Sequence, residues 1–148
     1  MKRPMKVLLF TSMLVALSAC GGGESAEETG AVQNRGVTDT EIVLGVGTDL
    51  SGATAIWGVG ATNGARMRFE EANAAGGVHG RKIRYVVEDT SYQVPKAISA
   101  ANKLINRDNV LAFVLSVGTP LNNAVMPIQF ENNVLNLFPI SGGRQMVE

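Results

Sequence analysis

Three short stretches of the sequence combine glycine with hydroxyl side chains, and each directly follows an apolar run. They are "TDLSGATAIWG" (residues 48–58), "SVGTPL" (116–121) and "ISGG" (140–143). Glycine lets backbone amides approach a ligand closely, and hydroxyl groups donate hydrogen bonds to it. Trp57, near the end of the first stretch, would supply a flat apolar wall with one hydrogen-bond donor. These residue types favour binding of a small molecule.

The second stretch has the chemistry to hold a carboxylate. Pro120 is typical of the first turn of a helix, and the free backbone amides of a helix N-terminus favour negative charge. Gly118 would expose its amide there. Thr119 has two open interpretations, because its hydroxyl could donate to a bound carboxylate or simply cap its own helix.

The glycines of the first stretch do not match a nucleotide-binding loop. The dinucleotide fingerprint G-x-G-x-x-G needs a small residue at its last position, but Gly45-Val46-Gly47 is followed there by Leu50. The sequence also lacks the G-K-[ST] of a phosphate-binding loop. We therefore expect no nucleotide cofactor, and no other cofactor is indicated.

The pattern of apolar residues predicts which elements position these stretches. Nearly continuous apolar runs predict four buried strands, at residues 41–47, 82–89, 110–116 and 133–140. Helical periodicity predicts three helices between them, over residues 58–75, from Pro95 and from Pro120. The order β-α-β-α-β-α-β favours the α/β class with an open, doubly wound parallel sheet. Ligands bind at the carboxyl ends of such strands, where the three stretches and residues 89–92 lie.

Each predicted helix has one apolar face to turn toward the sheet. The predicted inward residues are Ala61, Ala65, Phe69 and Ala72 in the first helix, Ile98, Ala101, Leu104 and Ile105 in the second, and Leu121, Ala124, Val125 and Ile128 in the third.

The first twenty residues have the pattern of a bacterial lipoprotein signal. A basic start, "MKRPMK", precedes the apolar run "VLLFTSMLVAL" and the tetrad "LSAC" that ends at Cys20. The run is short for a membrane span, which needs about 20 residues. We predict a signal peptide over residues 1–19 and lipidation of Cys20. Cys20 is the only cysteine, so the chain contains neither an internal disulfide nor a cysteine-based zinc site.

Residues 20–37 are rich in Gly, Ser and Glu and show no apolar period, which predicts a flexible tether before a domain over residues 38–148. The chain has 13 basic and 13 acidic residues. Removing Lys2, Arg3 and Lys6 with the leader leaves a formal charge of −3. This balance favours an exported binding protein and gives no basic patch for nucleic acid, so we expect no nucleic-acid partner.

From Thr38 to its end the chain resembles the leucine-binding-protein family, the type I periplasmic binding proteins that serve ATP-driven importers. The most specific matching segments are "NGARMRFEEANAAGGVHGRKI", "VVED" and "GTPLNNAVMP". The resemblance implies a two-lobed receptor that closes on a small solute, often a branched-chain amino acid or an amide. The chain would be an N-terminal fragment with an incomplete first lobe. Its partners would be an ABC permease and ATPase, and its location the periplasm or cell surface, with a lipid anchor in the membrane.

The resemblance also suggests roles for particular residues. Ser141 and Gly142 match positions that offer a hydroxyl and a carbonyl to the ammonium of the ligand, and Trp57 matches an aromatic residue of the side-chain pocket. Many leucine-type receptors have a run of hydroxyl residues where this sequence has "VGTP", which leaves the ligand open. The predicted ligand-binding set is Trp57, Gly118, Thr119, Ser141 and Gly142. Asp89 is expected to hold its strand end through backbone amides, and Tyr92 is not included.

Two other classes of function are compatible with a small exported α/β protein: an enzyme and a ligand sensor. Hydrolytic catalysis would need a G-x-S-x-G pentad or a base beside a nucleophile. No such pentad occurs, and the only histidine, His79, lies in a turn on the opposite side of the sheet. We therefore expect neither an enzyme nor a metal site. The alternative is a ligand-sensing domain of the same fold joined to a membrane receptor, but the lipoprotein signal favours a free-standing receptor.

The leader generates a first prediction. Mass spectrometry of the exported protein should find a diacylglyceryl-cysteine N-terminus at Cys20, and Cys20→Ser should release the protein from membranes. A mature chain that begins at any other residue would contradict the assignment.

Overall fold

The computed structural model describes residues 35–144, which form an open parallel sheet with helices on both faces. The strand order is β2-β1-β3-β4, and every neighbouring pair is parallel. The predicted α/β class and doubly wound parallel sheet are therefore confirmed. In chain order the elements are β1 (Glu41–Thr48), α1 (Ala55–Ala74), β2 (Lys82–Asp89), α2 (Val94–Asn106), β3 (Ala112–Val114), α3 (Thr119–Glu131) and β4 (Leu135–Leu137).

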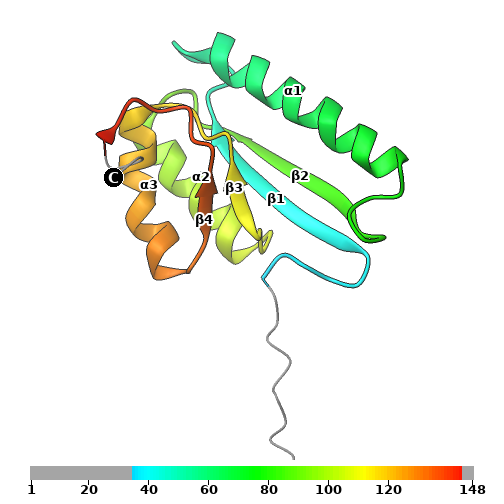
Figure 1. Cartoon of the computed structure of the whole chain (residues 1–148). Helices are drawn as coiled ribbons and strands as arrows, with labels where there is room; N and C mark the ends of the chain where they lie inside the picture. Colours follow the sequence, from blue (N-terminus) through cyan, green and yellow to red (C-terminus); the bar gives the residue numbers. More distant parts are fainter. Residues whose placement is uncertain (1–34, 145–148) are drawn as a thin grey trace, which may run out of the picture. The chain divides into compact units, whose positions relative to one another are not determined.

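Helix α1 covers one face of the sheet, whereas α2 and α3 pack side by side on the other (Figure 1). On the α1 side, the rings of Phe69 and Tyr85 meet edge to face with their centroids 5.2 Å apart. On the other side, Gly45 lets Leu104 of α2 and Val110 pack closely on β1, because a Cβ there would lie 3.1 Å from Leu104 and 2.8 Å from Val110. The main core lies on this second face and contains Val43, Ala97, Ala101, Leu104, Ile105, Val110, Phe113, Leu121, Val125 and Val134.

Two details of the helices differ from the prediction. Helix α1 begins three residues earlier than expected, so Trp57 lies in its first turn instead of before it. In α2 the predicted inward residue Ile98 is 37% exposed, and Ala97 and Ala100 face the core in its place. The small side chain of Ala100 suits this position because it lies over Gly47, where α2 packs closely on β1.

Strands β3 and β4 are shorter than their apolar runs predict. Leu115 and Phe138 adopt positive φ angles of 65° and 52°, which interrupt the extended backbone just after each strand. Parallel pairing then resumes in an isolated bridge between Val117 and Ile140. Each of the two apolar runs is therefore interrupted by a kink, which the composition of the run does not predict.

The packed part of the chain includes residues that the sequence assigned to the tether. Arg35 donates a hydrogen bond from Nη1 to the carbonyl of Ile105 (2.7 Å), and Gly36 accepts one from the amide of Val43 (2.7 Å). Packing thus extends at least three residues before Thr38. The predicted signal peptide and Cys20 lie outside the described residues. Within residues 35–144, the helices are too short or too polar to span a bilayer.

The outer edge of β4 is apolar and exposed. Within residues 35–144, β4 pairs only with β3, and Phe130, Leu135 and Phe138 beside this edge are 71%, 65% and 75% exposed. Unpaired backbone groups next to apolar side chains form a template for association with another chain.

We therefore predict that the 148-residue chain self-associates through this edge. Sedimentation velocity should show species larger than a monomer, and Leu135→Lys should shift the chain toward the monomer because it places a charge on the edge. Met67→Lys is the matched control, since Met67 is 71% exposed but lies on α1. A wild-type chain that is monomeric at all concentrations would contradict this prediction.

Candidate ligand-binding site

Backbone hydrogen bonds continue past the ends of β3 and β4 and bring two of the predicted stretches together. The amide of Ile140 donates to the carbonyl of Ser116 (2.9 Å), and the amide of Gly118 donates to the carbonyl of Ile140 (3.0 Å). As a result, the loop that leads into α3 lies directly beside the loop that follows β4.

The hydroxyl of Thr119 links these two loops. Its Oγ1 accepts hydrogen bonds from the Ser141 hydroxyl and the Gly142 amide, both at 3.1 Å. Thr119 does not cap α3, because Gly118 occupies the N-cap position and no side chain bonds the free amides there. Since a hydroxyl oxygen has two acceptor positions and both are used, Thr119 presents its hydrogen as the group available to a ligand.

Two neighbours hold the Gly118 backbone in place. Gly118 has a φ of 102°, and a Cβ at this residue would lie 2.6 Å from Cε2 of Tyr92, so only glycine fits. The buried Asn122 donates from Nδ2 to the carbonyls of Ser116 (3.2 Å) and Gly118 (2.8 Å), and its Oδ1 accepts from Asn136 (2.8 Å). Asn122 is not in the predicted set, because an asparagine in a helix is usually a surface residue.

On the other side of the site, the buried carboxylate of Asp49 organises the turn before α1. It accepts hydrogen bonds from the amides of Ser51 (3.3 Å), Gly52 (2.6 Å) and Thr54 (2.7 Å), and from the Thr54 hydroxyl (2.8 Å). Burial raises the pKa of Asp49, but these hydrogen bonds together outweigh burial and leave its pKa below the ordinary value of 3.8. Asp49 is not in the predicted set either, because only the folded turn shows how many amides converge on it.

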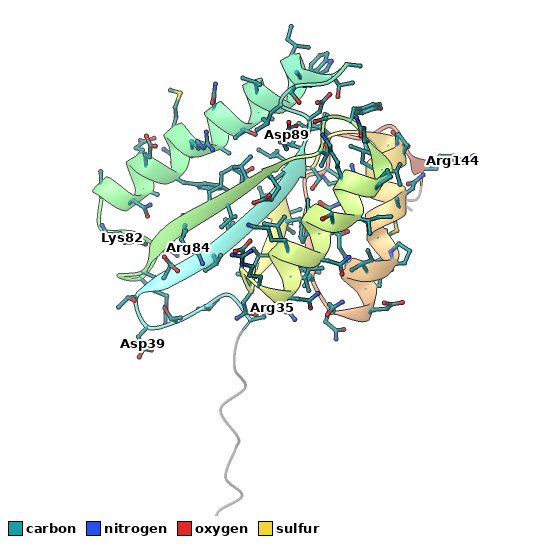
Figure 2. All side chains as sticks on the ribbon, turned by 180° about the vertical axis from the view of Figure 1, so that it is seen from behind. Arg35, Asp39, Lys82, Arg84, Asp89 and Arg144 are labelled. Atoms are coloured by element: carbon teal, nitrogen blue, oxygen red, sulfur yellow. The ribbon has the colours of Figure 1, made fainter. Side chains whose placement is uncertain are left out.

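Asp89 ties the turn after β1 to the end of β2. Its carboxylate accepts from the amides of Leu50 (2.9 Å) and Ser91 (2.8 Å) and from the Ser51 hydroxyl (2.6 Å). Burial raises the pKa of Asp89, but hydrogen bonds from Ser51, Leu50 and Ser91 lower it to about 2. The predicted role of Asp89 as a strand-end anchor is confirmed, and Figure 2 shows it at the end of the sheet opposite Asp39 and Lys82.

These loops enclose an open depression with a volume of about 410 Å³, which we call the polar depression. All five predicted ligand-binding residues line it, and the single tryptophan, Trp57, is 64% exposed there. Four other residues that line it are not in the predicted ligand-binding set, although three of these four belong to the glycine- and hydroxyl-containing stretches of the sequence. The full lining is Thr54, Trp57, Tyr92, Val117, Gly118, Thr119, Ile140, Ser141 and Gly142.

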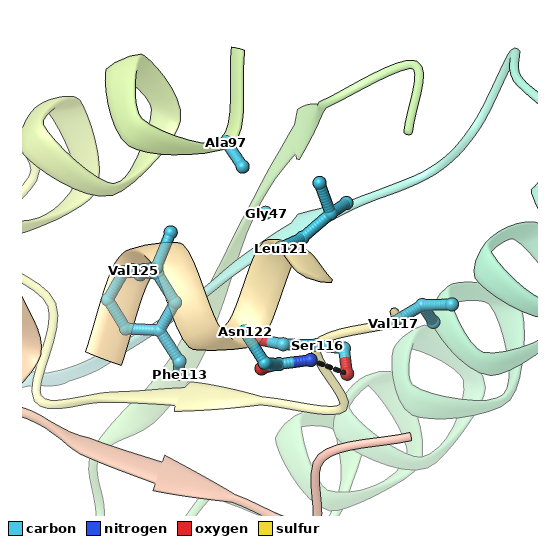
Figure 3. Close-up of a pocket in the computed structure, with 8 residues that line it drawn as sticks. All are labelled: Gly47, Ala97, Phe113, Ser116, Val117, Leu121, Asn122 and Val125. Carbon is cyan, nitrogen blue, oxygen red and sulfur yellow. Dashed lines mark hydrogen bonds between the residues drawn. The ribbon is translucent and has the colours of Figure 1, made fainter. Parts of the chain in front are cut away.

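A second space, inside the core beneath the loop of residues 116–118, is too small for a solute. It measures about 10 Å³ and lies between β1, α2, β3 and α3 (Figure 3). Asn122 and Ser116 both line it and are joined by the hydrogen bond from Asn122 Nδ2 to the Ser116 carbonyl (Figure 3). A void of this size holds about one water molecule at most. The polar depression is therefore the better candidate for a solute.

The histidine is placed as the sequence predicted. His79 is exposed in the turn before β2, at the amino end of the strand and away from the depression. In the described part of the chain, no three His, Cys, Asp or Glu side chains gather closely enough to hold a metal ion.

Comparison with known proteins places the chain in a family. The model of the periplasmic binding protein family matches residues 41–145, which includes every element of the sheet. The chain belongs to this family. Within it, the chain has the fold of the type I periplasmic binding proteins of the leucine-binding family. The relatives found are binding proteins rather than enzymes.

Individual relatives agree with this family. A Leu/Ile/Val-binding protein homologue from Brucella abortus is 32% identical over 91% of this chain and 33% of its own. A fatty acid ABC transporter substrate-binding protein from Thermomonospora curvata is 37% identical, with a TM-score of 0.64 over 75% of this chain and 27% of its own. The branched-chain amino acid transporter substrate binding protein LivJ from Streptococcus pneumoniae, solved in complex with isoleucine, is 25% identical, with a TM-score of 0.64 over 68% of this chain and 34% of its own. The chain therefore spans about a third of the length of these periplasmic binding proteins.

Asp49 generates a prediction about stability and pH. Asp49→Asn should lower the free energy of unfolding at pH 7 by about 1–3 kcal/mol, because a buried amide loses its acceptor. The lowered pKa means that the carboxylate stabilises the fold above pH 3.8, and that this stabilisation fades as pH falls below that value. The difference between variant and wild type should shrink accordingly.

Urea unfolding at a series of pH values measures this effect. Asp39→Asn is the control, because Asp39 is exposed at the opposite end of the sheet (Figure 2). A constant difference between Asp49→Asn and wild type from pH 7 to pH 2 would show that the charge of Asp49 contributes nothing.

Proposed function

We propose that this protein is an extracytoplasmic solute receptor that binds the carboxylate of a small solute in the polar depression, with a branched-chain amino acid as the leading candidate. In the proposed role the lipidated Cys20 anchors the exported protein to a membrane, and an ABC permease and ATPase take up the captured solute. The names of the relatives support this role. They refer to Leu/Ile/Val, isoleucine and fatty acid, which all join a carboxylate to an apolar group.

The observation that carries the proposal is the hydroxyl of Thr119. With both acceptor positions occupied by Ser141 and Gly142, it faces the depression as a donor and favours a ligand group that accepts. It lies in the first turn of α3, where the helix dipole adds to the preference for negative charge.

The remaining walls suit the rest of such a solute. Ser141 Oγ donates to Thr119 and accepts from the Gly143 amide (3.2 Å), which leaves one acceptor position for an ammonium group. The exposed indole of Trp57 provides apolar contact in the same depression.

Trp57 also provides the measurement, because it is the only tryptophan in the chain. Titration of wild type with L-leucine, L-isoleucine or L-valine should change its fluorescence. Thr119→Val should weaken binding by about one to two decades, since a charged oxygen that loses its donor costs about 1.5–3 kcal/mol.

The matched control for this substitution is Thr40→Val, which removes an exposed hydroxyl at the opposite end of β1. Circular dichroism should show that both variants remain folded. Equal affinity of wild type and Thr119→Val for a bound amino acid would remove Thr119 from the site. No fluorescence response of wild type to any of the three amino acids would contradict the proposed solute class.

A further inference from the structure

A second open depression, of about 510 Å³, adjoins the polar one; we call it the apolar depression. The two share Trp57 and Ile140 as common walls and are therefore adjacent. The lining of the apolar depression comes mainly from the first turns of α1 and consists of Ile56, Trp57, Gly60, Ala61 and Ile140.

The two depressions differ sharply in chemistry. The polar depression contains the hydroxyls of Thr54, Thr119 and Ser141, whereas every side chain of the apolar depression is hydrocarbon or indole. Ile56 and Trp57 are 82% and 64% exposed at its rim, although exposed apolar side chains gain nothing from water. A hydrocarbon group that covered them would be stabilised by their burial.

Internal packing does not require a glycine at position 60, which forms part of this surface. A Cβ at Gly60 would meet nothing within 4 Å, and glycine is a poor helix former compared with alanine. Its missing side chain instead keeps the depression open next to Ala61. Gly64 lies one turn further along α1 and is equally free of contacts, but it does not line the depression.

We propose that the solute is an amphiphilic monocarboxylate whose apolar tail crosses Trp57 and Ile140 into the apolar depression while its carboxylate remains at Thr119. This inference rests on the proposed function, because it assumes that the polar depression binds the carboxylate. It specifies a solute with a longer hydrocarbon tail than the polar depression alone would select.

The test is a fluorescence titration of Trp57 in the full chain with pentanoate, hexanoate and octanoate, and with L-leucine as the reference amino acid. Each methylene that becomes fully buried should strengthen binding about fourfold, and a half-covered one about twofold. Affinity should therefore rise along the series in wild type.

Gly60→Leu should abolish this rise, because its side chain fills the apolar depression, and it should leave pentanoate binding unchanged. Gly64→Leu should behave as wild type, since it adds the same side chain outside the depression. Ile56→Asn provides a second variant that keeps the space but makes its rim polar. It should reduce the affinity for octanoate more than that for pentanoate.

Each outcome decides between the two proposals. If L-leucine and pentanoate bind but affinity does not rise with chain length, the carboxylate site stands and the apolar depression is not used. An equal rise in wild type, Gly60→Leu and Gly64→Leu would mean that the acids adsorb elsewhere, and would overturn the inference. No response to any acid or to L-leucine would overturn both proposals.

Discussion

The site depends on the pairing of two backbone segments beyond the strands to which they belong. After the kinks at Leu115 and Phe138, the chain segments pair again at Val117 and Ile140, and this bridge sets the loop before α3 against the loop after β4. The hydrogen bonds from Ser141 and Gly142 to Thr119 follow from this placement. Without the bridge, the donor that carries the proposed function would have no defined orientation.

Gly118 and Asn122 hold the loop before α3 in the conformation that this pairing needs. Gly118 leaves room for the Tyr92 ring at a φ that other residues rarely adopt. Asn122 satisfies two loop carbonyls that would otherwise be buried without donors. Their contribution is local, but it decides the position of the first turn of α3 and hence of Thr119.

On the other side of the site, the carboxylates of Asp49 and Asp89 hold the turn before α1 in place. Asp49 gathers the amides of the turn before α1, and Asp89 joins that turn to the end of β2. Their lowered pKa values show that the surrounding donors stabilise the charged form more than burial disfavours it. Trp57 lies directly beyond this turn, so its place in the depression depends on a hydrogen-bonded scaffold and not on packing of the indole itself.

The sequence by itself determined the alternation of strands and helices along the chain and the parallel arrangement of the strands, and it predicted the end of the sheet where a ligand would bind. These follow from the period of apolar residues and from the rule that parallel strands place their carboxyl ends together. It also predicted that Trp57, Gly118, Thr119, Ser141 and Gly142 would lie near one another, and the structure places all five around one depression.

Only the tertiary structure decided whether Thr119 caps its helix, which way its hydroxyl points, and which buried groups hold the loops. Asp49 and Asn122 act through amides and carbonyls from other turns, and such contacts have no local sequence period. The kinks at Leu115 and Phe138 were hidden for the same reason, because both residues continue an apolar run. Apolar periodicity reports which side of an element is buried, whereas hydrogen-bond direction depends on groups that meet only after the chain has folded.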